Sequence, residues 1–171
     1  MLITVKDIPI TGKHYTCQIR EKDLEMDLKF LKPVLFDGTA YKSSDDIRLC
    51  GHITTCIEVS CHRCLEAFPL ELSADFEVYY RPYPTQAEIS DDSELSLGEL
   101  GVMHYEENVI DLAVVTRDTI IVEMPMKLLC KEDCLGLCPH CGENHNKKQC
   151  NCHEEHNISN PFKAFFKQTA M

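Results

Sequence analysis

The sequence lacks several features that would place it in familiar functional classes. No apolar run approaches the roughly 20 residues of a membrane-spanning helix, so we expect no association with a membrane. There is no Gly-rich phosphate loop, and neither an H-E-x-x-H nor a G-x-S-x-G motif. Residues 1–7 have no basic-then-apolar signal pattern, which predicts a cytoplasmic protein.

Positive charge is also scarce. The 171 residues include 17 Lys and Arg against 28 Asp and Glu, a formal net charge of −11, which argues against broad coating of nucleic acid. Residues 1–123 hold 11 basic and 23 acidic side chains, whereas residues 124–171 hold 6 basic and 5 acidic side chains. The sequence therefore predicts an acidic body followed by a near-neutral tail.

The body has the alternation typical of β-strands. Apolar side chains recur at every second position over 47–61 and again over 68–80, which predicts two long strands that pair as an antiparallel hairpin. Further strands are expected over 2–10 and 15–20. We therefore expect an α+β protein with a mostly antiparallel, curved or barrel-like sheet.

One helix is expected to pack on this sheet. Asp111 is a typical N-cap residue, and Leu112, Val115, Thr119 and Val122 follow it at helical spacing before Pro125. The predicted organisation is a β-rich acidic body over 1–125, with an acidic loop at 81–108, then a Cys-rich zinc-binding segment over 126–157. Residues 158–171 are expected to form a C-terminal tail or short helix.

Cysteine is the residue in excess. An odd count of 11 in a chain with no secretion signal argues for metal ligation rather than a closed disulfide framework. Six of the 11 lie between Cys130 and Cys152. Cys138-Pro139-His140-Cys141-Gly142 has the form of a zinc knuckle, in which Gly142 can take a positive φ as the chain leaves the turn.

Eight cysteines sort into two sites of four. Cys138, Cys141, Cys150 and Cys152 would form a local site, and Cys61 and Cys64 would complete a second site with Cys130 and Cys134, tying the tail to the body. A one-site alternative joins Cys61, Cys64, Cys138 and Cys141. His153 and His156 are alternative ligands in place of Cys150 or Cys152, and Cys17, Cys50 and Cys56 are expected to be packing residues.

The spacing favours structural metal over redox or catalytic chemistry. One or two Zn²⁺ ions are expected, although iron uses the same four-cysteine ligands. A thiol–disulfide enzyme would place its Cys-x-x-Cys at a helix N-terminus, whereas Cys64 is followed by a predicted strand. The alternative is a redox or metal-carrier protein with rubredoxin-like or zinc-ribbon cysteines.

Both cysteine blocks resemble a known family. Cys61–Glu66 resembles the Cys-x-Arg-Cys-Leu signature of the bacterial YceD-like family, and Leu129–Asn144 and Cys150–Cys152 are similar to its second block. Asp111-Leu112 and Glu123–Pro125 match the elements between the blocks. The chain departs from the family at His145, where Leu is usual.

This resemblance implies a non-enzymatic ribosome-biogenesis factor that supports accumulation of large-subunit rRNA. The implied partner is pre-ribosomal RNA or a basic ribosomal protein, and no small-molecule substrate is expected. Direct RNA contact would use basic residues near the knuckles: Arg63, Lys127, Lys131, Lys147 and Lys148. The alternative for the lysines is a solvated face.

Overall fold

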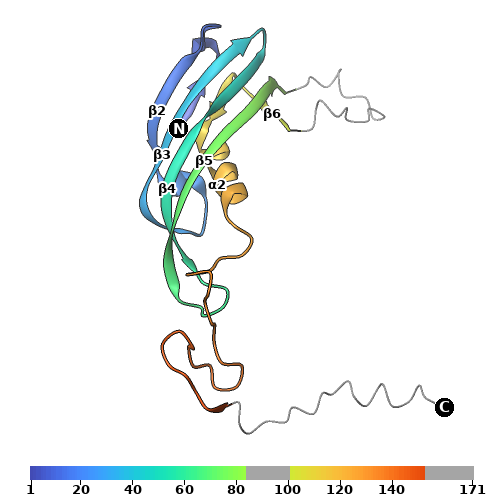
Figure 1. Ribbon diagram of the computed structural model, residues 1–171. Helices are drawn as coiled ribbons and strands as arrows, with labels where there is room; N and C mark the ends of the chain where they lie inside the picture. The colour runs from blue at the N-terminus through green and yellow to red at the C-terminus, as the bar shows by residue number, and fades with distance from the viewer. Residues whose placement is uncertain (84–100, 153–171) are drawn as a thin grey trace, which may run out of the picture. The chain divides into compact units, whose positions relative to one another are not determined.

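The computed structural model describes residues 1–83 and 101–152 (Figure 1). The chain divides into two compact units: unit 1 comprises Met1–Val59 and Ala67–Leu128, and unit 2 comprises Ser60–Glu66 and the chain from Leu129 on. Part of the predicted acidic loop and the whole predicted tail 158–171 lie outside the described residues. So do His153 and His156. In the described part of the chain, no helix has the length and hydropathy needed to cross a membrane.

Unit 1 contains every named helix and nearly all of the strand residues. In chain order these are β1 (Leu2–Thr4), the 3₁₀ helix η1 (Val5–Asp7), β2 (Lys13–Ile19), α1 (Glu21–Leu24), β3 (Lys29–Ser43), β4 (Asp46–Ser60), β5 (Ala67–Pro82), β6 (Val102–Tyr105), β7 (Val109–Asp111) and α2 (Leu112–Glu123). The predicted strands over 47–61 and 68–80 correspond to β4 and β5. The segment predicted as a strand over 2–10 is strand only in β1 and then turns into η1.

The main sheet has five strands in the order β2-β3-β4-β5-β6. The pairs β2–β3 and β3–β4 are antiparallel, whereas β5 and β6 pair in parallel over Tyr79–Pro82 and Val102–Tyr105. The expectation of a mostly antiparallel, barrel-like sheet is therefore wrong, and the sheet is mixed. It is also open, because β2 and β6 are its two edges and no pairing joins them among the described residues.

The physical reason for this correction lies in the connection between β5 and β6. A parallel partner needs a crossover of about a dozen residues or more, and the chain between Pro82 and Val102 is long enough. Alternation within a strand fixes which side chains face the core, but it does not fix the direction of the neighbouring strand. The strong hairpin signal in β4 and β5 therefore says nothing about β6.

Close approach of the backbones explains one glycine of β4. Gly51 lies opposite Gly38 of β3, and a Cβ on Gly51 would clash with the Asp37 carbonyl oxygen and the Gly38 Cα. The two glycines therefore allow β3 and β4 to pack at a separation that side chains would prevent.

The core lies between α2, which packs against β5, and one face of the sheet (Figure 1). Its most deeply buried large side chains include Phe36, Ile47, Leu49, Ile57 and Leu112. The Asp111 side chain accepts a hydrogen bond from the Ala113 N–H, which confirms the predicted N-cap and contributes about 1 kcal/mol. Val122, expected on the packed face, is 84% exposed, and Ile120 is buried in its place.

Candidate metal centres

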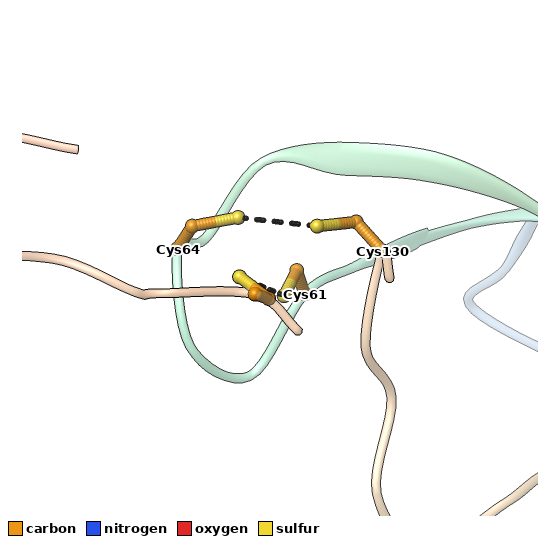
Figure 2. A group of neighbouring side chains, drawn as sticks. Cys61, Cys64 and Cys130 are labelled. Carbon is orange, nitrogen blue, oxygen red and sulfur yellow. Dashed lines mark hydrogen bonds between the residues drawn. The ribbon is translucent and has the colours of Figure 1, made fainter. Parts of the chain in front are cut away.

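Four cysteine thiols meet in unit 2 to form what we call centre 1. Cys61 and Cys64 lie on the loop between β4 and β5, and Cys130 and Cys134 follow α2 in the sequence. Their four Sγ atoms lie within 4.8 Å of one another. The Sγ atoms of Cys61 and Cys134 lie 3.7 Å apart and those of Cys64 and Cys130 3.6 Å apart, and Figure 2 shows the latter pair facing each other.

A second group of four thiols, centre 2, is local in sequence. It consists of Cys138, Cys141, Cys150 and Cys152, whose Sγ atoms also lie within 4.8 Å of one another. The structure therefore brings together the same two groups of four that the spacing favours. It does not group Cys61 and Cys64 with Cys138 and Cys141, as the one-site alternative requires.

The two Cys-x-x-Cys turns have the same backbone pattern. In centre 1, the Cys61 N–H donates to the Glu66 carbonyl at 2.9 Å and the Leu65 N–H to the Cys61 carbonyl at 2.9 Å. In centre 2, the Cys138 N–H donates to Glu143 at 2.8 Å and the Gly142 N–H to Cys138 at 2.9 Å. The corresponding bonds match, so both turns are knuckles of the same kind.

The residue after each knuckle has a positive φ. Gly142 has φ 75°, as the sequence predicts, and the equivalent residue in the first knuckle is Leu65 with φ 59°. Non-glycine residues adopt this left-handed conformation at a cost of about 1–2 kcal/mol. The first knuckle therefore stores strain that glycine relieves in the second.

The spacing of the thiols fits a single tetrahedral ion. With metal–sulfur bonds of about 2.3 Å, the sulfur atoms of a tetrahedron lie about 3.8 Å apart, close to the 3.6 and 3.7 Å of centre 1. A multi-iron cluster binds its cysteines to different irons and holds the sulfurs further apart. Each centre could therefore hold one metal ion.

Backbone amides favour the thiolate at the first cysteine of each knuckle. The Cys141 and His140 N–H groups lower the pKa of Cys138 to about 5. Burial raises the pKa of Cys61, but hydrogen bonds from the Cys64, Cys130 and Arg63 backbones outweigh it and lower the pKa to about 6. These N–H groups supply the charge stabilisation that a metal-bound thiolate needs.

Other thiols in the same centres have the opposite shift. Burial and the neighbouring thiols raise the pKa of Cys130 to about 12, and hydrogen bonding with Cys141 and Cys150 raises that of Cys152 to about 12. Four crowded thiols cannot all ionise without a counter-ion. A divalent cation would supply that counter-ion and displace the remaining protons.

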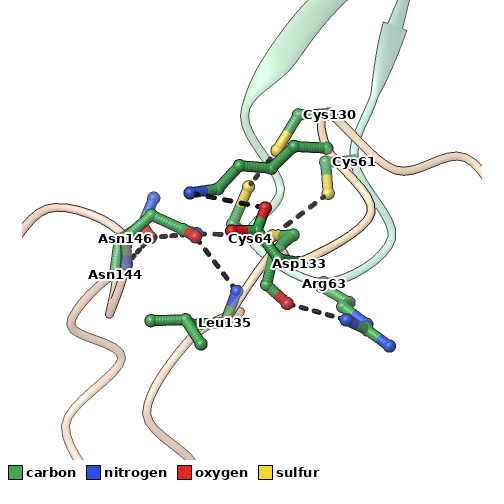
Figure 3. Close-up of polar contacts among 10 residues, drawn as sticks. Cys61, Arg63, Cys64, Cys130, Asp133, Leu135, Asn144 and Asn146 are labelled. Atoms are coloured by element: carbon green, nitrogen blue, oxygen red, sulfur yellow. Dashed lines mark hydrogen bonds and ion pairs between the residues drawn. The ribbon is translucent and has the colours of Figure 1, made fainter.

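Side chains outside the two centres also support centre 1 (Figure 3). The Asn146 amide nitrogen donates to Cys134 Sγ at 3.3 Å, and the Arg63 guanidinium donates to the Cys134 carbonyl at 2.8 Å. Burial raises the pKa of Cys134, but hydrogen bonds from Asn146 and the Gly136 backbone outweigh it, so the pKa is lowered. Sequence reasoning missed Asn146, for which the only signal was its place in the Asn144-His145-Asn146 triplet.

The basic residues predicted to contact RNA are mostly engaged within the protein. The Arg63 guanidinium donates to the Cys134 carbonyl oxygen. Lys131 Nζ lies 3.8 Å from Asp133 Oδ1, and Lys147 forms an ion pair with Glu66. Lys127 and Lys148 are exposed, and they belong to unit 1 and unit 2 respectively. Three of the five basic side chains therefore already have partners within unit 2.

The three remaining cysteines belong to unit 1 and to neither centre. Cys56 is buried, and Cys17 and Cys50 are partly buried. Cys50 donates from Sγ to the Thr39 carbonyl at 3.8 Å. Their places in β2 and β4 agree with the expected packing role.

Comparison with known proteins covers most of the chain. Residues 49–166 match the family model described as "Large ribosomal RNA subunit accumulation protein YceD". An uncharacterized protein of Mycobacterium leprae, ML1660, is 28% identical over 110 residues, which are 64% of this chain and 48% of that protein.

Two plant relatives are named "Large ribosomal RNA subunit accumulation protein YCED homolog 1, chloroplastic". The Arabidopsis thaliana protein is 27% identical over 146 residues, 70% of this chain and 46% of its own. The Zea mays protein is 26% identical over 159 residues, 79% of this chain and 54% of its own. The chain thus spans about half the length of these relatives. No solved structure matches it.

Proposed function

The chain belongs to the YceD family of large ribosomal RNA subunit accumulation proteins, and we propose on that premise that it is a non-enzymatic ribosome-biogenesis factor. Its role is to support the accumulation of large-subunit rRNA. The observation that carries this proposal is the family match over 49–166, which spans both groups of cysteines. Two relatives bear the same description in their names.

The charge distribution favours a basic ribosomal protein over pre-ribosomal RNA as the direct partner. Residues 1–123 carry 23 acidic and 11 basic side chains, which attract a basic protein and repel a phosphate backbone. In unit 2, the side chains of Arg63, Lys131 and Lys147 already have hydrogen-bond or ion-pair partners within the protein. RNA binding through the same cations would compete with these interactions.

The role proposed for the two centres is structural, with one Zn²⁺ in each. Its support is the four-sulfur donor set of each centre, the sulfur–sulfur distances of 3.6 and 3.7 Å in centre 1, and the amide hydrogen bonds to the sulfurs. Such an ion would neutralise crowded thiolates in both centres, and at centre 1 it would also cross-link segments distant in sequence. Iron has the same ligand preference, so metal analysis decides between them.

Deletion of the gene tests the biological role. The expected result is a lower ratio of large-subunit to small-subunit rRNA, with accumulation of precursor particles in a sucrose gradient and rescue by the intact gene. An unchanged rRNA ratio, with the protein sedimenting free of ribosomal particles, would exclude the proposal. A cytoplasmic location is part of the proposal, and fractionation tests it, since both plant relatives are named chloroplastic.

Affinity capture tests the choice of partner. Mild formaldehyde crosslinking followed by nuclease treatment should retain a basic ribosomal protein with the chain. Ultraviolet crosslinking that instead recovers rRNA at unit 2, and loses it in Lys147→Glu or Lys148→Glu, would favour direct RNA binding.

Metal analysis separates structural zinc from the redox or metal-carrier alternative. Two zinc ions per chain, with no visible absorption and no reversible redox wave, are expected. Iron with a reversible potential would support a redox protein, and rapid transfer of the metal to an acceptor protein would support a carrier.

A further inference from the structure

Asn146 belongs by sequence to one centre and by contact to the other. It lies in the eight-residue segment between Cys141 and Cys150, which are both thiols of centre 2. Yet its amide nitrogen donates to Cys134 Sγ of centre 1 at 3.3 Å. A side chain from the segment flanked by two thiols of centre 2 therefore lies against a sulfur of centre 1.

The orientation of this amide is fixed by its other hydrogen bonds. Asn146 Oδ1 accepts from the Leu135 N–H at 3.0 Å, so the amide nitrogen must face the other way, towards Cys134. The second hydrogen of that nitrogen bonds to Asn144 Oδ1 at 2.8 Å. One acceptor and two donors are thus all used, and rotating the amide would break each bond.

The backbone around Asn146 is also tied to centre 1. The His145 N–H donates to the Gly136 carbonyl at 3.0 Å, and Leu137 pairs with Asn144 in an isolated β-bridge. Gly136 and Leu137 follow Cys134 of centre 1 by two and three residues. The segment therefore reaches centre 1 through both its backbone and the Asn146 side chain.

The thiols of centre 2 lie at both ends of this segment, at Cys141 and Cys150. The segment 142–149 is polar, and none of its residues is fully buried, so apolar burial does not order it. Bringing together the thiols at its two ends fixes the loop and removes conformational freedom that Asn146 would otherwise have.

We propose that the two centres bind metal with positive cooperativity and that Asn146 is the positioning residue that couples them. Metal at centre 2 orders the loop, the loop sets Asn146 against Cys134, and the supported thiolate binds its metal more tightly. The coupling is reciprocal, so metal at centre 1 also favours metal at centre 2. This inference rests on the structural-metal part of the proposed function and does not depend on the ribosomal role.

A double-mutant cycle on the full reduced chain tests the coupling. Apoprotein is titrated with ¹¹³Cd²⁺ against a competing chelator, and ¹¹³Cd NMR resolves one line for each centre. Cys138→Ser/Cys141→Ser disables centre 2 and should weaken Cd²⁺ binding at centre 1 about tenfold or more. Asn146→Ala should weaken it to a similar extent, since removing a hydrogen-bond partner of a ligand typically costs about 10–100-fold in metal affinity.

The combined variant gives the decisive result. In a chain that already carries Asn146→Ala, adding Cys138→Ser/Cys141→Ser should lower the Cd²⁺ affinity of centre 1 by less than about threefold. The further loss is small because the coupling residue is already gone. A further loss of tenfold or more would overturn the role of Asn146. An unchanged centre 1 affinity in Cys138→Ser/Cys141→Ser alone would overturn the coupling itself.

Two matched variants exclude a general disturbance of the loop. Asn146→Asp keeps the acceptor for the Leu135 N–H but replaces the donor with a negative oxygen, so it should weaken centre 1 more than Asn146→Ala. Gln149→Ala changes an exposed side chain of the same loop and should leave both lines unchanged. Equal losses of Cd²⁺ affinity at centre 1 in Asn146→Ala, Asn146→Asp and Gln149→Ala would overturn the proposal, because the effect would then not depend on the amide donor.

The cycle also separates the two levels of inference. Two ions that bind with independent affinities would overturn the coupling and leave structural metal intact. A parent chain that binds no ion at either centre would overturn both the coupling and the structural metal. The rRNA measurements test the ribosomal role independently of either outcome.

Discussion

The two units of the chain bury different kinds of atoms. Unit 1 buries aliphatic and aromatic side chains, among them Phe36, Leu49 and Ile57, which are fully inaccessible. Among the described residues of unit 2, the buried side chains are those of four cysteines: Cys61, Cys64, Cys134 and Cys138. Gly136 is the remaining buried residue. One unit is built around hydrocarbon and the other around sulfur.

This difference implies different sources of stability. A compact unit needs buried apolar surface to offset the loss of chain entropy, and short segments without such a core usually depend on metals or disulfides. Unit 1 has that core. Unit 2 gathers eight thiols in two groups, so on our proposal two ions take the place of the core. Selective perturbation of each unit should therefore have separable effects.

The largest expected effect is loss of metal from centre 1. Cys61→Ser removes one of four thiols and should reduce the bound zinc from two ions to one or fewer, as measured by mass spectrometry of the native protein. Cys17→Ser, a thiol of β2 outside both centres, is the control and should retain two. Full zinc content in Cys61→Ser would remove Cys61 from the ligand set.

The converse substitution lies in the core of unit 1. Leu49→Ala leaves a cavity at a fully buried position and should lower the free energy of unfolding of unit 1 by about 2–5 kcal/mol. Denaturant titration monitored by circular dichroism measures the change. Zinc content should stay at two, and a parallel loss of metal would show that the units are not separately stabilised.

Close packing of β3 against β4 gives a smaller effect. Gly51→Ala places a methyl group against the Asp37 carbonyl and the Gly38 Cα, and it should cost about 1–3 kcal/mol of stability. Gly38→Ala is the milder counterpart, since its nearest atoms, on Phe36 and Cys50, lie at 3.0 and 3.1 Å. Equal thermal midpoints for both variants would contradict this account of the strand pair.

Substitutions in the two knuckles should have the smallest effects on stability, and these effects should be opposite in sign. Gly142→Leu puts a side chain at φ 75° where no atom crowds the new Cβ, so only backbone strain of about 1–2 kcal/mol is added. Leu65→Gly relieves the same strain but adds freedom to the unfolded chain, so its net gain should stay below about 1 kcal/mol. The chelator concentration needed to remove metal from each centre measures the effect of both substitutions. Weakening of centre 1 by Leu65→Gly would contradict the equivalence of the knuckles.

The sequence was most informative where a regular period or a fixed spacing carried the signal. Alternation predicted β4 and β5, and the N-cap preference of Asp111 predicted the start of α2. The cysteine spacing predicted which thiols to group, and the structure places those thiols together. That they bind zinc stays a prediction.

Elements whose pattern is interrupted were not predicted. β3 spans Lys29–Ser43 but contains Pro33 and register shifts between Phe30 and Leu35, and each irregularity breaks the two-residue period. The parallel direction of β6 has no signature in its four residues. In both cases tertiary pairing, rather than local pattern, defines the strand.

Side-chain partners distant in sequence were also out of reach. Lys147 and Asn146 are polar residues in a polar segment, and nothing local indicates that one pairs with Glu66 and the other with Cys134. The Lys147 ammonium holds the pKa of the Glu66 carboxyl below its usual range, which is a consequence of the folded knuckle. That Arg63, Lys127, Lys131, Lys147 and Lys148 contact RNA or a protein partner stays a prediction.

Hydrogen exchange of the full chain, with and without a zinc chelator under reducing conditions, tests the contrast between the units most directly. Chelation should abolish protection of backbone amides over 60–66 and 129–152, while β3 and β4 up to Val59 keep theirs, because the apolar core of unit 1 does not depend on metal. Unchanged protection of 60–66 and 129–152 after complete metal removal would contradict the account, and so would simultaneous loss of protection in both units.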